Sequence, residues 1–74
     1  VPVRRAYADL YEKMQRIYAD KLIADGISEE RATSIAMMMT ASIEGAMMLS
    51  LTQKAVHPLR VVSQELLKII KANK

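Results

Sequence analysis

The sequence predicts an all-α fold of three helices, at about residues 3–25, 28–53 and 58–72. In each of these segments apolar residues recur at intervals of three and four, the period of one face of an α-helix. Gly26 and Pro58 separate the segments, and the sequence has neither the alternation typical of a strand nor an internal repeat. We therefore expect one helical domain at most.

The first segment, about residues 3–25, carries an apolar stripe along one side of the helix. The stripe consists of Val3, Tyr7, Leu10, Met14, Ile17 and Tyr18, with Tyr11 at its margin. Gly26 is the natural stop, because only glycine takes the left-handed conformation after a helix without a steric penalty. We expect this helix to end near Asp25.

The second segment, about residues 28–53, is the most informative part of the chain. Between Ile35 and Leu51 it has no generous polar face, and such a helix must be covered on nearly every side. Ser28 is placed to cap its N-terminus, where Glu29 and Glu30 favour the positive end of the helix dipole. Two shorter helices shield only part of it, so the surplus apolar surface indicates a second copy of the protein or a missing part of a larger one.

Gly45 lies at the centre of this segment, on a face rich in small residues. That face carries Ser34, Met38, Ala41, Gly45 and Thr52, whereas another carries Ile35, Met39, Ser42, Ala46 and Leu49. An interior glycine costs about 1 kcal/mol relative to alanine, which is best explained by another helix approaching too closely for a side chain. A tolerated glycine in a normally packed helix is the alternative, and the interface would then lie on the other face.

The third segment, about residues 58–72, begins at Pro58, whose missing amide hydrogen is tolerated in the first turn of a helix. We expect residues 53–57 to form the connecting turn. An apolar stripe of Leu59, Val62, Leu66, Ile69 and Ile70 lies opposite Arg60, Gln64, Lys68 and Lys71.

The composition argues against an enzyme and against a metal or cofactor site. Catalysis needs groups that converge with shifted proton affinities, and the chain has one histidine and no cysteine. His57 precedes a proline and is better explained as a surface or capping residue. The net charge of +3 comes from cations spread among acids, which indicates a solvated surface and not a nucleic-acid site. The apolar run is slightly short for a membrane span and contains Glu44, so we expect no membrane contact.

Glu44 is the anomalous charge of the sequence. The residues one helical turn away are Thr40, Ala41, Met47 and Met48, none of which is positive, so any partner lies on another helix. Its stripe, which comprises Thr33, Met37, Thr40, Glu44 and Leu51, is either a partly wet edge or the wall of a ligand pocket. The five methionines at 37–39, 47 and 48 and the three tyrosines are interpreted first as core residues and second as pocket lining.

Four short motifs in a fixed order carry a family resemblance over almost the whole chain. The first helix ends in Asp25-Gly26-Ile27 and is followed by Ser28-Glu29-Glu30-Arg31-Ala32; later come Ser42-Ile43-Glu44-Gly45-Ala46-Met47-Met48-Leu49 and Pro58-Leu59. This order resembles the C-terminal end of TetR-family transcriptional regulators. The resemblance implies a regulator, usually a repressor, in the cytoplasm, with residues 1–74 as its regulatory and dimerisation segment. The N-terminal helix-turn-helix is lacking, and a start at Val1-Pro2-Val3 without methionine suggests a fragment or processed product.

The resemblance also implies site residues and partners. The last two helices are expected to form a four-helix dimer interface with a second subunit, through Met38, Ala41, Gly45, Met48, Leu49, Leu59, Val62, Leu66 and Ile69. A small apolar or amphipathic effector is expected to meet Tyr7, Tyr11, Met14, Tyr18, Met37, Thr40 and Glu44. Operator DNA would be bound only by the missing N-terminal domain. The alternative is a free-standing helical homodimerisation scaffold without a ligand.

Overall fold

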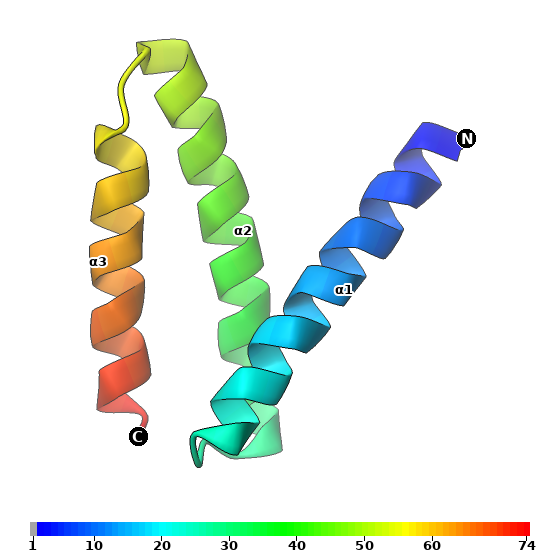
Figure 1. Cartoon of the computed structure of the whole chain (residues 1–74), viewed down its shortest axis with the longest axis vertical. Helices are drawn as coiled ribbons and strands as arrows, with labels where there is room; N and C mark the ends of the chain where they lie inside the picture. Colours follow the sequence, from blue (N-terminus) through cyan, green and yellow to red (C-terminus); the bar gives the residue numbers. More distant parts are fainter. Residues whose placement is uncertain (1) are drawn as a thin grey trace.

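The computed structural model describes the backbone of residues 2–74 and the side chains of residues 3–74. Its helices are α1 (Pro2–Ala24), α2 (Glu29–Gln53) and α3 (His57–Ala72), which confirms the all-α prediction. Figure 1 shows α2 and α3 side by side as an antiparallel hairpin, while α1 meets α2 near the start of α2 and diverges from it toward the N-terminus. The described chain is therefore a flat slab, with extents of 36 × 33 × 13 Å.

The turn between α1 and α2 has the glycine-terminated geometry that the sequence predicts. Gly26 has φ of +97°. Its amide donates to the carbonyl of Ile23 at 2.9 Å, and the amide of Ile27 donates to the carbonyl of Leu22 at 3.1 Å. These two bonds satisfy carbonyls at the helix end, and the side chains of Leu22 and Ile27 are both buried beside them. The turn thus satisfies the backbone at the end of α1 and also contributes the first two buried side chains of the core.

The start of α2 also agrees with the prediction. The Ser28 hydroxyl accepts a 3.3 Å hydrogen bond from the amide of Arg31, and Glu29 and Glu30 occupy the first turn. Such a cap satisfies one of the amides that a helix N-terminus leaves without a partner.

The connection between α2 and α3 is shorter than predicted. Lys54 ends α2 in the left-handed conformation, with φ of 53°. Val56 already occupies the N-cap position of α3, where its carbonyl accepts from the amide of Arg60 at 3.1 Å. The expected turn at 53–57 was therefore wrong at both ends, and His57 is helical, because Pro58 fits the first turn as well one residue later.

The core lies at the end of the slab where the three helices meet. Leu22, Ile27, Ala32 and Ile35 are buried there. Met38 and Met39 of α2 and Ile70 of α3 pack against them. On α3 the predicted stripe is confirmed: Leu66 is buried and Leu59, Val62, Ile69 and Ile70 are half-buried, whereas Arg60, Gln64, Lys68 and Lys71 are exposed.

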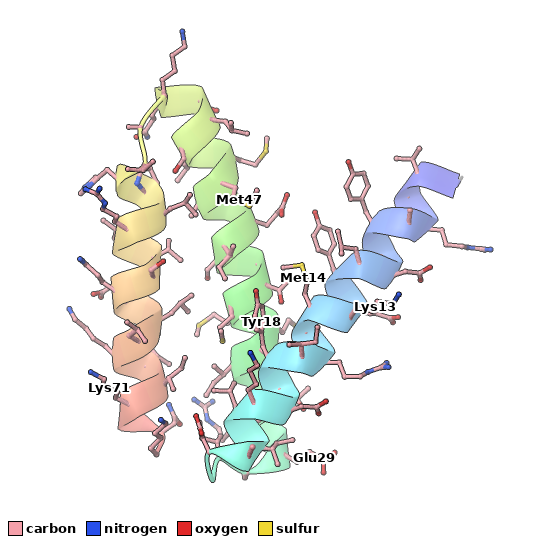
Figure 2. All side chains as sticks on the ribbon, viewed as in Figure 1. Lys13, Met14, Tyr18, Glu29, Met47 and Lys71 are labelled. Carbon is pink, nitrogen blue, oxygen red and sulfur yellow. The ribbon has the colours of Figure 1, made fainter. Side chains whose placement is uncertain are left out.

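The apolar stripe predicted for α1 is not part of this core. Val3, Tyr7, Leu10 and Ile17 are half exposed or more, because α1 leaves α2 as it runs toward its N-terminus and no other helix of the described chain covers it. Figure 2 shows Met14 and Tyr18 extending from α1 toward α2, and both are half-buried.

The methionines also depart from the core interpretation. Met38 and Met39 are half-buried against the core, but Met37, Met47 and Met48 are exposed. The reason is again geometric, because α2 has only one helix on either side of it and extends well past its contact with α1 (Figure 1). The surplus apolar surface expected from the sequence is thus present on α2.

Candidate functional site

A cleft lies between α1 and α2, where the two helices begin to separate. Tyr11 and Gln15 line it from α1, and α2 contributes Met37, Thr40, Ala41 and Glu44. Its volume is about 290 Å³, and it is open to solvent. The α2 residues recur at three and four positions and therefore form one stripe along that helix. Tyr11 and Gln15 are likewise one turn apart on α1.

The polar groups of this cleft differ in how well they are satisfied. Thr40 is buried, and its hydroxyl donates a 2.9 Å hydrogen bond to the carbonyl of Ala36 within its own helix. Glu44 is half-buried and faces Tyr11 across the cleft. Within residues 3–74 the ion pairs are Glu65 with Lys68 and Asp25 with Lys74, so Glu44 has no cation beside it. The carboxylate of Glu44 is therefore the charged acceptor of the site, and it has no salt-bridge partner among the described residues.

Tyr11 is electrostatically linked to Glu44. Partial removal of its hydroxyl from water raises the pKa of Tyr11 above the ordinary value of 10.0, and a hydrogen bond to the Glu44 carboxylate and the negative charge of Glu44 raise it further. The ring of Tyr11 stacks on that of Tyr7, with centroids 6.2 Å apart and planes at 22°. At neutral pH the Tyr11 hydroxyl is therefore protonated and available as a hydrogen-bond donor on the α1 side of the cleft.

The structure brings together only part of the predicted effector set. Tyr11, Met37, Thr40 and Glu44 line the cleft. Tyr7 is exposed and touches the site through its stacking on Tyr11, whereas Met14 and Tyr18 lie on the α2 side of α1 outside the lining. Gln15 was not predicted as a cleft residue, although its position one helical turn after Tyr11 places it on the same side of α1. Ala41, assigned from the sequence to dimerisation, lines this cleft as well.

The residues predicted for dimerisation divide into two groups. On α3, Leu66 is buried and Leu59, Val62 and Ile69 are half-buried within the hairpin itself. On α2, Ala41, Gly45, Met48 and Leu49 are exposed, and Met38 is half-buried. A Cβ added at Gly45 would meet nothing within 4 Å, so no helix of the described chain crosses closely at this glycine. Any close neighbour at Gly45 therefore lies outside residues 3–74 of this chain.

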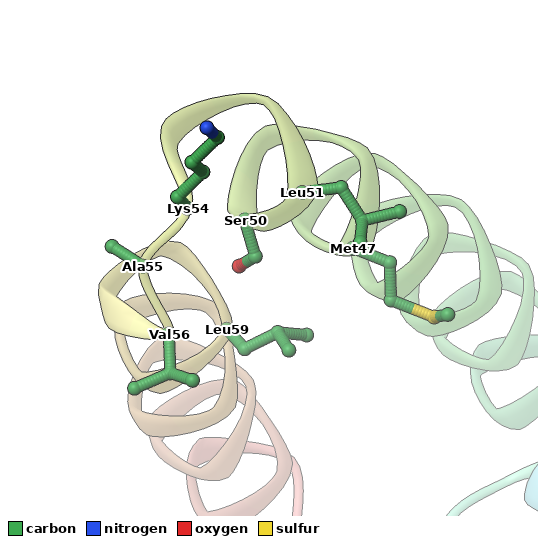
Figure 3. Close-up of a pocket in the computed structure, with 7 residues that line it drawn as sticks. All are labelled: Met47, Ser50, Leu51, Lys54, Ala55, Val56 and Leu59. Atoms are coloured by element: carbon green, nitrogen blue, oxygen red, sulfur yellow. The ribbon is translucent and has the colours of Figure 1, made fainter.

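A second cavity of about 360 Å³ lies at the turn between α2 and α3 (Figure 3). Its lining is almost wholly apolar and consists of Met47, Ser50, Leu51, Lys54, Ala55, Val56 and Leu59. Among the described residues the Oγ atom of Ser50 is a buried oxygen without a hydrogen-bond partner, and Figure 3 shows it directed toward the start of α3. Sequence reasoning did not identify this cavity, because it depends on how the hairpin closes.

The described part of the chain was also compared with the requirements of a metal site and of a membrane span. Residues 2–74 contain no cluster of three or more histidine or acidic side chains that could hold a metal ion. By length and composition α2 could cross a membrane, a property that it shares with core helices of soluble proteins, and 22% of its most apolar stretch is buried within the chain.

Comparison with known proteins gives a consistent family. The model of the C-terminal domain of LmrA/YxaF-like transcriptional regulators matches residues 1–65. The HTH-type transcriptional regulator LmrA of Bacillus subtilis is 39% identical over 62 residues, covering 84% of this chain and 33% of the relative. The uncharacterized HTH-type regulator YxaF of the same organism is 31% identical over 65 residues, covering 88% of this chain and 34% of the relative.

A relative from a second organism gives a similar match. The uncharacterized HTH-type regulator Rv0196 of Mycobacterium tuberculosis is 31% identical over 71 residues, covering 96% of this chain and 37% of the relative. The chain thus spans about a third of the length of these relatives. No solved structure matches.

Proposed function

Because the chain belongs to the LmrA/YxaF-like C-terminal domain family of TetR-type transcriptional regulators, we propose that it joins two subunits of such a regulator and forms one wall of its effector site. It is a regulatory domain and not an enzyme. The relatives are named as helix-turn-helix regulators, and the chain spans about a third of them, so operator binding belongs to a preceding domain of a longer protein. This class of protein acts in the cytoplasm.

The observation that carries the effector role is the cleft of Tyr11 and Glu44. The cleft combines the Glu44 carboxylate, which has no salt-bridge partner among the described residues, with the neutral Tyr11 hydroxyl and the apolar side chain of Met37. These residues lie on two helices that contact each other at one end only. Ligand sites are typically apolar hollows with a few polar groups that fix orientation. A ligand held between α1 and α2 would bias the angle between them, which is how a domain of this shape would transmit a signal.

The observation that supports dimerisation is the exposed apolar surface of α2. Met48 and Leu49 are 59% and 52% exposed, and Ala41 and Gly45 beside them leave room for a close helix. A two-fold pairing of identical hairpins buries such a surface in a closed assembly. Two α2–α3 hairpins then form a four-helix bundle.

Substitution at Gly45 tests the dimer. Gly45→Leu should weaken the dimer by about 1–3 kcal/mol or more if a second subunit packs there, as overpacking does. Gln64→Leu, on the exposed side of α3, is the matched control. Dissociation constants from sedimentation equilibrium compare the two variants. Equal effects would mean that the face of Gly45 does not contact a second subunit. The other face considered from the sequence cannot replace it, because Ile35 and Ala46 are buried within the chain. A stable folded monomer at micromolar concentration would refute the dimer altogether.

Substitution at Glu44 tests the effector site in the whole regulator. Glu44→Gln keeps the size of the side chain and removes its charge, so it should change the effector concentration that releases operator DNA while the dimer stays intact. Operator release is measured by fluorescence anisotropy of labelled DNA. An unchanged response to every effector of that regulator would favour a wet helix edge without a ligand, and the chain would then act as a dimerisation scaffold only.

A further inference from the structure

The cavity at the turn between α2 and α3 has room for a small ligand with an apolar body. Its volume of about 360 Å³ lies at the lower end of the range of ligand pockets, about 300–1,000 Å³. Its apolar lining comes from both helices and from the turn, through Met47, Leu51, Val56 and Leu59. Figure 3 shows the side chain of Leu59 extending from α3 toward α2. Burial of an alkyl chain among these side chains would favour binding.

The hydroxyl of Ser50 is the unsatisfied polar group of this cavity. The hydroxyls of Thr33, Thr40 and Thr52, on the same helix, donate hydrogen bonds of 2.8, 2.9 and 2.8 Å to the carbonyl four residues earlier. The Oγ atom of Ser50 is buried and has no such partner among the described residues. A buried hydroxyl without a partner is unfavourable, and a ligand oxygen that accepts from it would satisfy it.

The surroundings of the cavity are positively charged. Residues 45–64 include Lys54 and Arg60 but no aspartate or glutamate. Lys54 is exposed at the rim of the cavity, and neither ion pair within residues 3–74 includes it. The acidic residues on either side in sequence, Glu44 and Glu65, do not line the cavity. The ligand that complements this charge is an anion.

The start of α3 adds a second source of positive potential. Val56, which lines the cavity, is the N-cap residue of this helix, and its side chain makes no capping hydrogen bond. The first turn of α3 contains no acidic residue. The N-terminal end of a helix carries a partial positive charge and favours an anionic group nearby. An anionic head group at this border of the cavity would supply the negative charge that the first turn of α3 lacks.

The cavity is separate from both surfaces of the proposed function. It shares no lining residue with the cleft between α1 and α2. Met47 and Lys54 follow Gly45 by two and nine positions, which at about 3.6 residues per turn places both about half a turn away from it. A second subunit packed on Gly45 would therefore leave the cavity accessible.

We propose that this cavity binds an amphipathic carboxylate, such as a medium-chain fatty acid. The carboxylate accepts a hydrogen bond from the Ser50 hydroxyl and lies near Lys54 and the start of α3. The alkyl chain lies among Met47, Leu51 and Leu59. A neutral ligand would leave the positive charge of the turn unused, and an inorganic anion would leave the apolar lining unused.

Three ligands with the same octyl chain and different head groups provide the test. Octanoate, octanol and octyltrimethylammonium are titrated into the protein, and binding is followed by NMR through the methionine methyl groups. Met47 lines the cavity, whereas Met14 of α1 does not. The two methyl groups therefore distinguish binding in the cavity from binding elsewhere.

Two variants, each with a matched control, test the head-group contacts. Ser50→Ala removes the hydroxyl, and Ser63→Ala is its control. Lys54→Gln removes the charge at the rim, and Lys71→Gln is its control. Both control positions are exposed on α3 and lie outside the lining of the cavity.

Octanoate should shift the methyl resonance of Met47, leave that of Met14 unchanged, and bind more tightly than octanol or octyltrimethylammonium. Ser50→Ala should weaken octanoate binding about ten-fold, the scale of one hydrogen bond to a charged group. Lys54→Gln should weaken it about three-fold, because water screens an exposed charge. The two controls should leave the affinity unchanged.

The proposal would be overturned by octanoate binding that shifts Met14 and not Met47, by the absence of any shift at Met47, or by equal affinities for the three ligands. A loss in Ser50→Ala or in Lys54→Gln that is no larger than the loss in its control would overturn it as well.

Discussion

Arg31 and Asn73 are joined by a 3.2 Å hydrogen bond from the arginine Nε to the asparagine Oδ1, across 42 positions of sequence. The side-chain nitrogen Nδ2 of Asn73 also donates to the carbonyl of Ile69 at 2.8 Å, which stabilises the last turn of α3. Next to it, Lys74 Nζ lies 3.4 Å from Asp25 Oδ2. The end of α3 is thus tied to the turn between α1 and α2, at the same end of the slab as the core.

Neighbouring leucines on α3 test the position of this core. Leu66 is 7% exposed and Leu67 is 57% exposed. Leu66→Ala should lower the free energy of unfolding by about 2–4 kcal/mol, because it removes buried methyl groups and leaves a cavity. Leu67→Ala should change it by no more than about 0.5 kcal/mol. Urea denaturation followed by circular dichroism measures both, and similar losses would mean that Leu67 is covered in solution.

The two glycines should respond to alanine with opposite signs. Gly26 has φ of +97°, where a Cβ is strained, so Gly26→Ala should destabilise the protein by about 1–2 kcal/mol. Gly45 is in a helix interior with open space around it, so Gly45→Ala should stabilise the isolated chain by up to about 1 kcal/mol. Thermal unfolding at low protein concentration separates the two. Destabilisation by Gly45→Ala would reveal a close neighbour that the single chain lacks.

The cap of α2 is open to a similar comparison. Ser28→Ala removes the acceptor for the amide of Arg31 and should cost about 1 kcal/mol of stability. Ser34→Ala, at an exposed position inside the helix, should be neutral or slightly stabilising, because alanine has the better helix propensity. Chemical denaturation of both variants gives the difference, and an equal response would show that the hydroxyl of Ser28 contributes nothing to the cap.

The ionisation of Tyr11 tests its link to Glu44. Titration of tyrosine absorbance should show one group above the ordinary pKa of 10.0, which disappears in Tyr11→Phe and shifts downward in Glu44→Gln. Because the folded state favours the protonated hydroxyl, its contribution to stability is complete below pH 10.0 and is lost as the pH rises through the folded-state pKa. If the pKa of Tyr11 were the same in Glu44→Gln as in the unmodified protein, the raised value would be due to burial and the neighbouring Tyr7, and not to Glu44.

Much of this architecture could be predicted from local signals. The three helices, the stop at Gly26 and the cap at Ser28 were predicted correctly. Each depends on residues within about four or five positions, which is the reach of a helix hydrogen bond or a cap. The stripe around Leu66 was also correct, because α3 lies along α2 for its whole length (Figure 1).

Burial and the candidate site depended on how the helices pack. The periodicity of the sequence predicted an apolar stripe on α1 from Val3 to Tyr18. Periodicity carries no information about the angle between α1 and α2. That angle exposes Tyr7 and Leu10 and opens the cleft at Tyr11. The anomaly of Glu44 was visible in the sequence because its neighbours are uncharged. That it faces a tyrosine became evident only when α1 and α2 were placed together, since residues 33 positions apart meet through tertiary packing and not through helix geometry.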